Sequence, residues 1–220
     1  MTAPLRHALD WARIAHDLRS PLMPLRTAAW LLRNEGSDSD RARELVDIVD
    51  RQSNRLARMV DELSDWGRTS EGAMPLNRGP VDAALALDMI IGAIPDCHVV
   101  PVVEGDASEM HVHADQQRLG MLLRALIEHA MHRDPSRSPE VSLSKSQGQL
   151  QVCVRDHGTP LDADAQAALL NQPLPVPFDD GLGLRLLLAV RIAEAHGGRL
   201  LVDTTTTEGL AMQCILPAQD

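Results

Sequence analysis

The sequence predicts an α plus α/β protein, in which a helical hairpin forms a dimeric four-helix bundle and is followed by a two-layer α/β sandwich. Three observations support this class. Apolar residues in the first third recur in alternating steps of three and four, the period of packed helices. Glycines and prolines between residues 67 and 80 indicate a linker. Beyond it, helical periods alternate with short runs of period two. We therefore predict domains at 1–68 and 81–220, joined by a linker at 69–80.

The first domain is expected to contain two helices. The first helix is expected from about Pro4 to Asn34 and ends at the turn signal 35–38; the second starts at Ser39 or Asp40 and reaches about Trp66. The apolar stripe of the first helix comprises Ala8, Trp11, Ala15, Leu18, Leu22, Leu25, Ala29 and Leu32, and that of the second comprises Leu45, Val49, Gln52, Leu56, Met59, Leu63 and Trp66. One hairpin cannot bury both stripes, so we expect two copies to pair into a bundle.

The second domain is expected to alternate helices and strands. Asp115 is placed to cap the N-terminus of a helix, and Gly197-Gly198 to end another. The expected helices cover 82–94, 115–131, 162–170 and 182–195, and the expected strands cover 97–103, 110–113, 141–145, 150–155, 200–204 and 210–216.

Composition restricts the class of partner. A net charge of −10 disfavours nucleic acid and anionic membranes, which select for basic patches. The three cysteines are widely spaced and form no CxxC pair, as expected for thiols in a reducing compartment. No apolar run reaches the ~18 residues of a membrane span, and no secretory signal is visible. We expect a cytoplasmic protein.

His16 is the first candidate for chemistry. It flanks the apolar stripe, so its imidazole is expected to be open to solvent, with the carboxylate of Asp17 beside it and Ser20 one turn later on the same face. A nucleophilic histidine needs an accessible ring nitrogen and a carboxylate that orients the ring. Pro21 and Pro24 are costly inside a helix, which indicates that they serve a purpose.

A second constellation lies in the α/β domain. Asp156-His157-Gly158 follows an expected strand, and a carboxylate there can accept a hydrogen bond from an exocyclic amine such as that of adenine. Gly181-Leu182-Gly183-Leu184 precedes an expected helix, where glycines allow backbone amides to approach an anion. Arg185 adds a cation directly after them. Order and spacing together favour a nucleotide site.

These motifs resemble those of two-component sensor histidine kinases. HDLRSPL at 16–22 resembles the H-box, DHG at 156–158 the G1 box, GLGLRLL at 181–187 the G2 box, and 195–217 the closing segment of the catalytic domain. The resemblance implies a dimerisation and histidine phosphotransfer domain followed by a gyrase-type ATP-binding domain. It also implies a protein histidine kinase that autophosphorylates His16 from ATP and passes the phosphate to a response-regulator aspartate.

The resemblance also assigns roles. Asp17 would act as general base and Ser20 would orient the acceptor. Asp156 would hold adenine, and Gly158 would line the phosphate path. The segment Gly181, Leu182, Gly183, Leu184 and Arg185 would complete the ATP site. The implied partners are a second copy of the chain and a response-regulator receiver domain, and a kinase of this kind would take its signal from a sensor protein on a separate chain.

The metal side departs from the family pattern. The N-box usually places two asparagines where this chain has Ala125 and His129, and the second glycine of the G1 box is replaced by Pro160. Glu128 and His129 remain as candidate ligands, but Mg²⁺ prefers oxygen ligands in octahedral geometry. We therefore expect ATP and Mg²⁺ to be held weakly. An alternative remains open: an ATP-independent histidine phosphotransfer, phosphatase or scaffold protein with a degenerate ATP-binding domain.

Overall fold

The computed structural model describes residues 9–34, 39–70, 74–203 and 208–218. The chain divides into two compact units. The first contains residues 1–67 together with 174–184, and the second contains 68–173 and 185–220. The segment 174–184, hereafter the lid segment, thus clusters with the predicted hairpin. Each unit is described separately.

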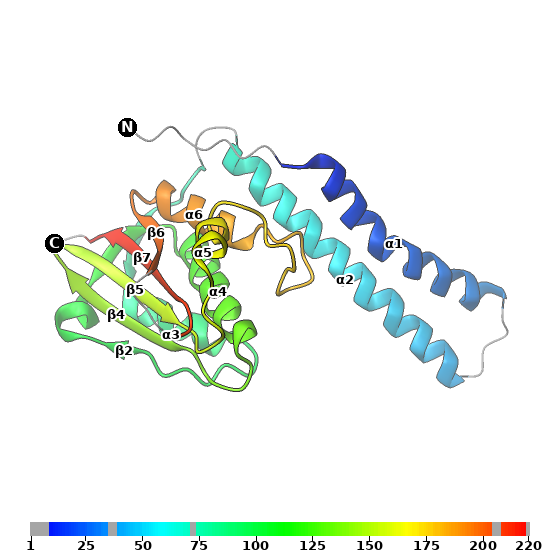
Figure 1. Ribbon diagram of the computed structural model, residues 1–220, viewed down its shortest axis with the longest axis horizontal. Helices are drawn as coiled ribbons and strands as arrows, with labels where there is room; N and C mark the ends of the chain where they lie inside the picture. The colour runs from blue at the N-terminus through cyan, green and yellow to red at the C-terminus, as the bar shows by residue number, and fades with distance from the viewer. Residues whose placement is uncertain (1–8, 35–38, 71–73, 204–207, 219–220) are drawn as a thin grey trace. The chain divides into compact units, whose positions relative to one another are not determined.

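The first unit is built on the helices α1 (Trp11–Asn34) and α2 (Ser39–Ser70), which run side by side as a hairpin (Figure 1). Asp10 caps α1, because its carboxylate accepts hydrogen bonds from the amides of Ala12 (3.0 Å) and Arg13 (3.2 Å). The predicted start at Pro4 lies outside the described residues. The helix runs through Pro21 and Pro24.

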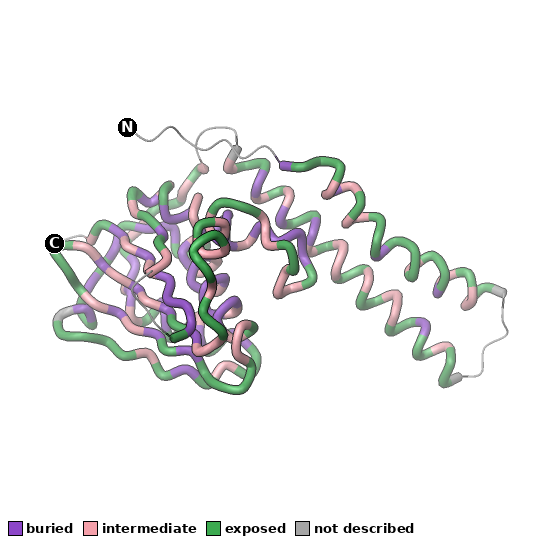
Figure 2. Tube along the Cα trace, in the orientation of Figure 1, coloured by how far each residue is buried: buried purple, intermediate pink, exposed green. Residues whose placement is uncertain are grey.

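The hairpin buries little of its own apolar surface. Figure 2 shows few buried positions along α1 and α2, in contrast to the dense core of the second unit. On α1 the buried residues Ile14, Pro21 and Ala28 are spaced by seven. They lie beside the predicted stripe, of which Trp11 and Leu22 remain 69% and 41% exposed. An apolar face is therefore left for a partner.

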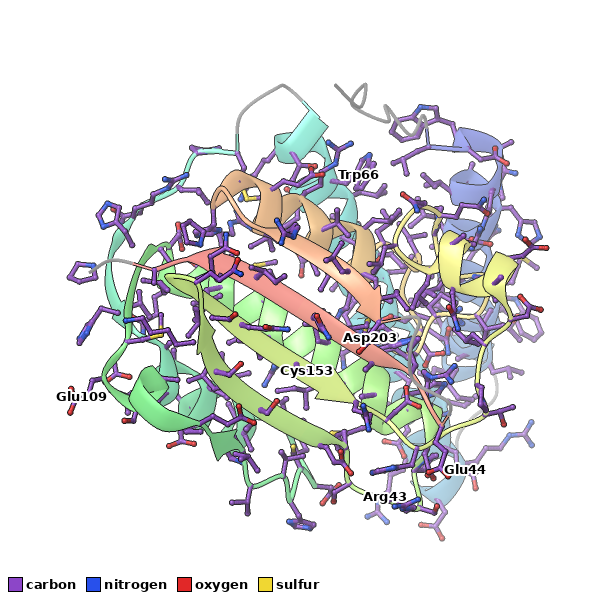
Figure 3. All side chains as sticks on the ribbon, turned by 60° about the vertical axis from the view of Figure 1, so that its left-hand side comes forward. Arg43, Glu44, Trp66, Glu109, Cys153 and Asp203 are labelled. Atoms are coloured by element: carbon purple, nitrogen blue, oxygen red, sulfur yellow. The ribbon has the colours of Figure 1, made fainter. Side chains whose placement is uncertain are left out.

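The second unit packs helices against a five-stranded sheet of order β2-β4-β5-β7-β6, and β1 and β3 form a separate antiparallel pair. Figure 3 shows the sheet with α4 behind it. Its helices are α3 (Ala83–Gly92), a 3₁₀ turn (Gly105–Glu109), α4 (Gln116–Arg133), α5 (Ala163–Leu169) and α6 (Arg185–Ala195). Its strands are β1 (Gly79–Asp82), β2 (Val102–Val103), β3 (His111–Ala114), β4 (Glu140–Ser146), β5 (Gln149–Arg155), β6 (Arg199–Asp203) and β7 (Ala211–Pro217).

Alternation in the sheet agrees with the sequence pattern. Leu150, Val152 and Val154 are buried, whereas Cys153 lies on the other face, toward the viewer in Figure 3. The predicted cap at Asp115 is also present, since its carboxylate accepts from the amide of Arg118 at 3.0 Å.

Three elements differ from the prediction. The strand expected at 97–103 is reduced to Val102–Val103. Gly79 and Pro80, placed at the end of the linker, instead begin the strand Gly79–Asp82, which pairs with β3. The helix expected from 182 begins at Arg185, so Leu182 and Leu184 lie outside it. None of the helices in the described ranges combines the length and apolarity required to cross a bilayer.

Candidate functional site

The phosphoacceptor candidate His16 projects from α1, with 82% of its side chain exposed. Its Nδ1 lies 3.2 Å from Oδ1 of Asp17, and the other carboxylate oxygen lies 3.5 Å from Nε of Arg13. The carboxylate of Asp17 thus lies between imidazole and guanidinium and can hold the Nδ1 proton, which leaves Nε2 as the open nucleophile. Ser20 follows one turn later and is exposed.

The two prolines change the backbone around this histidine. Pro21 and Pro24 lack an amide hydrogen, so the carbonyl groups of Asp17 and Ser20, four residues earlier, have no helical donor. The helix therefore has extra acceptor capacity on the turn that follows His16. Polar groups of a docking partner or water can use it.

Residues 181–184 of the G2 box lie in the lid segment of the first unit, whereas Arg185 begins α6 in the second unit. Oε2 of Glu62 on α2 accepts hydrogen bonds from the amides of Leu182 (3.1 Å) and Leu184 (3.2 Å). A Cβ atom on Gly181 would lie 1.9 Å from Oε1 of Glu62, so a larger residue at this position would have to displace the Glu62 side chain. Gly183 has φ +78°, a conformation that also favours glycine. The amides expected to bind phosphate therefore already donate to a carboxyl group.

Asp156, in the second unit, is 1% exposed and has several donors. Oδ1 accepts from the amides of Gly158 (2.8 Å) and Leu210 (3.2 Å), and Oδ2 lies 2.7 Å from Nε of Arg133. Gly209 passes close by, because a Cβ there would lie 1.9 Å from the Asp156 carbonyl oxygen. In this arrangement the guanidinium of Arg133 occupies the acceptor expected for adenine.

The two candidate metal ligands have surroundings that do not favour metal binding: one is ion-paired and the other is buried. Glu128 forms an ion pair with Arg185 and lies 3.7 Å from Nε of Arg124. His129 is buried, and burial followed by the charges of Arg133 and His132 lowers its pKa to about 4. Within the described ranges, no three His, Cys, Asp or Glu side chains gather in a way that could hold a metal ion. These residues do not fit a magnesium centre.

Anion binding fits the lid segment better, because a carboxylate already takes the position of a phosphate oxygen at two of its amides. Sequence reasoning missed the two side chains that occupy the expected nucleotide contacts. Glu62 falls between the apolar positions Met59 and Leu63, where a surface acid is the ordinary interpretation. Arg133 is the last residue of α4, and nothing in its spacing links it to Asp156.

The described chain thus combines an exposed histidine on a helical hairpin, a glycine-bounded loop at 181–184 whose amides donate to a carboxyl group, and an α/β unit. Family models agree: the His Kinase A (phospho-acceptor) domain matches residues 11–72, and the histidine kinase-, DNA gyrase B-, and HSP90-like ATPase domain matches 114–220. The chain belongs to the two-component sensor histidine kinase family.

Curated relatives are similar along most of this chain. Sensor histidine kinase MtrB of Mycobacterium leprae is 23% identical over 93% of the chain and 38% of its own length. Sensor protein DivL of Caulobacter vibrioides is 27% identical over 93% of the chain and 27% of its own length. The bacteriophytochrome of Pseudomonas aeruginosa is 29% identical, covering 87% and 27%. The chain thus spans less than half the length of these relatives.

Solved structures share the fold. Full-length ShkA, determined in complex with AMPPNP, has a TM-score of 0.72 at 22% identity and covers 94% of this chain and 45% of its own. Histidine kinase ThkA, determined in complex with the response regulator protein TrrA, has a TM-score of 0.73 at 17% identity, covering 94% and 60%. The expected helical hairpin followed by an α/β domain is confirmed.

Proposed function

We propose that this chain is the core of a histidine kinase, which transfers the γ-phosphoryl group of ATP to His16 and then to an aspartate of a response regulator. The observation that carries the proposal is the exposed imidazole of His16 with its Nδ1 3.2 Å from Asp17. The proposal is also supported by the family models for a phosphoacceptor domain and an ATPase domain. The working form is a homodimer.

In the proposed step, the Nε2 lone pair of His16 forms the new N–P bond while the bond between the γ-phosphorus and the leaving ADP oxygen breaks. Asp17 holds the Nδ1 proton, so the ring presents the correct tautomer and positive charge on it is stabilised. Ser20, one turn later, is placed to orient the acceptor or a water molecule. Positioning and charge neutralisation dominate phosphoryl transfer.

The remaining site residues are assigned to nucleotide binding. Amides of the 181–184 segment bind phosphate oxygens, together with Arg185 and the turn at Gly158. Asp156 accepts a hydrogen bond from the adenine amine once Arg133 moves away from it. Because Glu128 and His129 suit Mg²⁺ poorly, we expect weak metal dependence and slow autophosphorylation.

The test is incubation of the full chain with γ-labelled ATP in Mg²⁺ or Mn²⁺. Label on wild type should be acid-labile and alkali-stable, and His16→Gln should abolish it. His98→Gln is the matched control, since His98 is exposed and lies in the other unit. Persistent labelling of His16→Gln would remove the assignment.

A second candidate is ATP-independent phosphotransfer, in which His16 exchanges phosphate with receiver aspartates. The ion pair of Arg133 with Asp156 favours it, because adenine recognition then requires a buried pair to open. Labelling of His16 by a phosphorylated receiver domain, with none by ATP, would select this candidate.

A further inference from the structure

The lid segment is fastened to one face of α2 by its backbone. Arg55 donates from Nε to the carbonyl of Asp180 at 3.0 Å, and Arg58 donates from Nε to the carbonyl of Asp179 at 3.2 Å. Together with Glu62 these arginines recur in steps of three and four, so they share a helix face. This face, defined by Arg55, Arg58 and Glu62, satisfies both carbonyl and amide groups of the lid segment.

A further contact connects the lid segment to the phosphoacceptor helix. Arg13 donates from Nη2 to the carbonyl of Leu174 at 2.8 Å, and the same guanidinium pairs with Asp17. Leu174 in turn donates to the carbonyl of Gly183 at 3.0 Å, which closes the segment into a loop. The lid segment is therefore an ordered loop held by α1 and α2.

Glu62 is the centre of this contact. Its side chain is 5% exposed, and one oxygen accepts from the amides of both Leu182 and Leu184. Asp179 accepts from the amide of Gly181 at 3.1 Å, so two carboxyl groups converge on one turn of the lid segment. Burial, then the charge of Asp179, raises the pKa of Glu62 to about 7. Such convergence is costly unless the contact is maintained by many partners.

We propose that Glu62 is an autoinhibitory latch whose carboxyl group holds the amides of Leu182 and Leu184 and competes for them with nucleotide phosphate. The inference rests on the proposed function, because it assumes that these amides bind the phosphate groups of the nucleotide. A carboxylate and a phosphate oxygen are both acceptors, and one amide hydrogen cannot serve both at full strength. Nucleotide therefore binds fully only when the lid segment leaves Glu62.

The latch is tested on the full-length protein with a fluorescent ATP analogue and with hydrogen exchange of the 181–184 amides. Glu62→Met keeps the volume but cannot accept hydrogen bonds, so exchange should accelerate and nucleotide should bind about tenfold more tightly or better. Glu62→Gln keeps an acceptor oxygen without the charge, so it should remain latched, with amide exchange no faster and nucleotide affinity no higher than in wild type. Asp61→Met, at an exposed neighbour on α2, controls for the helix substitution.

Each outcome decides between the two ideas. Unchanged exchange in folded Glu62→Met overturns the latch and leaves the kinase proposal intact if wild type still labels His16. Accelerated amide exchange in Glu62→Met with unchanged nucleotide affinity overturns the proposal that Glu62 competes with nucleotide phosphate. Tighter binding by Glu62→Gln equal to that by Glu62→Met also overturns it, because charge repulsion alone then explains the effect. If no variant binds nucleotide at millimolar concentration, the proposed function fails as well.

Discussion

At the scale of single residues, the polar side chains expected to contact nucleotide and metal mostly have partners within the protein. Asp156 has Arg133, and Glu128 has Arg185. His16 is the contrasting case, because its ring is open to solvent and Asp17 contacts only one of its nitrogens. The residue expected to receive the phosphoryl group is exposed, whereas the acidic residues expected to contact nucleotide and metal form ion pairs within the protein. The proposed kinase activity would therefore require these ion pairs to open.

Arg133→Met tests the engagement of Asp156. Removing one partner of a buried ion pair should lower the free energy of unfolding by about 3 kcal/mol, because the 1%-exposed carboxylate loses its counterion. The vacated acceptor should then be available to the adenine amine, so ADP should raise the melting temperature of the variant more than that of wild type. Arg137→Met, at an exposed arginine, should change neither quantity. If ADP raised the melting temperature of Arg133→Met and of wild type by the same amount, this account would be contradicted.

At the scale of elements, periodicity predicted most helices and the paired strands, because these depend on local patterns. The strand β1 was missed since its residues, Gly79–Asp82, are rich in turn formers and become a strand only by pairing with β3. The start of α6 at Arg185 was missed for a similar reason. The preceding amides of Leu182 and Leu184 bind Glu62, which is remote in sequence. Local pattern cannot reveal such long-range partners.

The contact of α2 with the lid segment should make stability depend on pH. The pKa of Glu62 is raised from 4.5 to about 7 in the folded protein, so the folded state binds this proton more tightly than the unfolded state. Its contribution to the free energy of unfolding should fall as pH rises from about 4.5 to 7, by up to about 3 kcal/mol, and then level off. After burial, the charge of Asp179 contributes to this raised pKa, and Arg58 donates a hydrogen bond to the backbone carbonyl of Asp179.

Urea unfolding of Glu62→Gln at pH 5 and pH 8 measures this effect. The variant should match wild type near pH 5 and exceed it in stability at pH 8, because the amide side chain keeps the acceptor and carries no charge. Glu44→Gln, an exposed position on the same helix, should follow wild type at both values. If the free energy of unfolding of Glu62→Gln changed between pH 5 and pH 8 as much as that of wild type, the pH dependence would not come from Glu62.

At the scale of the whole molecule, the order of residues in sequence and their grouping in space differ at one place. The lid segment lies between α5 and α6 in sequence, yet it clusters with the hairpin. The motifs indicated which residues were candidates, and the structure shows that the candidates are divided between the units. His16 and the 181–184 amides belong to the first, whereas Asp156, Glu128 and Arg185 belong to the second.

Exposed apolar side chains on α1 indicate that a second copy of the chain covers this helix. Trp11, Met23 and Trp30 are each at least 60% exposed on α1, and the predicted stripe position Leu22 is also exposed. Isolated proteins rarely leave so much apolar surface uncovered on one element, and a second hairpin would cover it in a four-helix bundle. Light scattering at micromolar concentration should therefore give wild type twice the 24.0 kDa of one chain.

Charge placed on the two stripes should break this dimer. Leu22→Glu combined with Leu56→Glu puts carboxylates into the centre of the predicted bundle, where burying an unpaired charge costs several kcal/mol, about enough to separate the copies. The double variant should be monomeric or lose helicity in the hairpin. Leu85→Glu is the control, since Leu85 is 57% exposed on α3 of the second unit and its substitution should leave the mass unchanged. A monomeric wild type would refute the bundle, and a dimeric double variant would move the interface to another face of the hairpin.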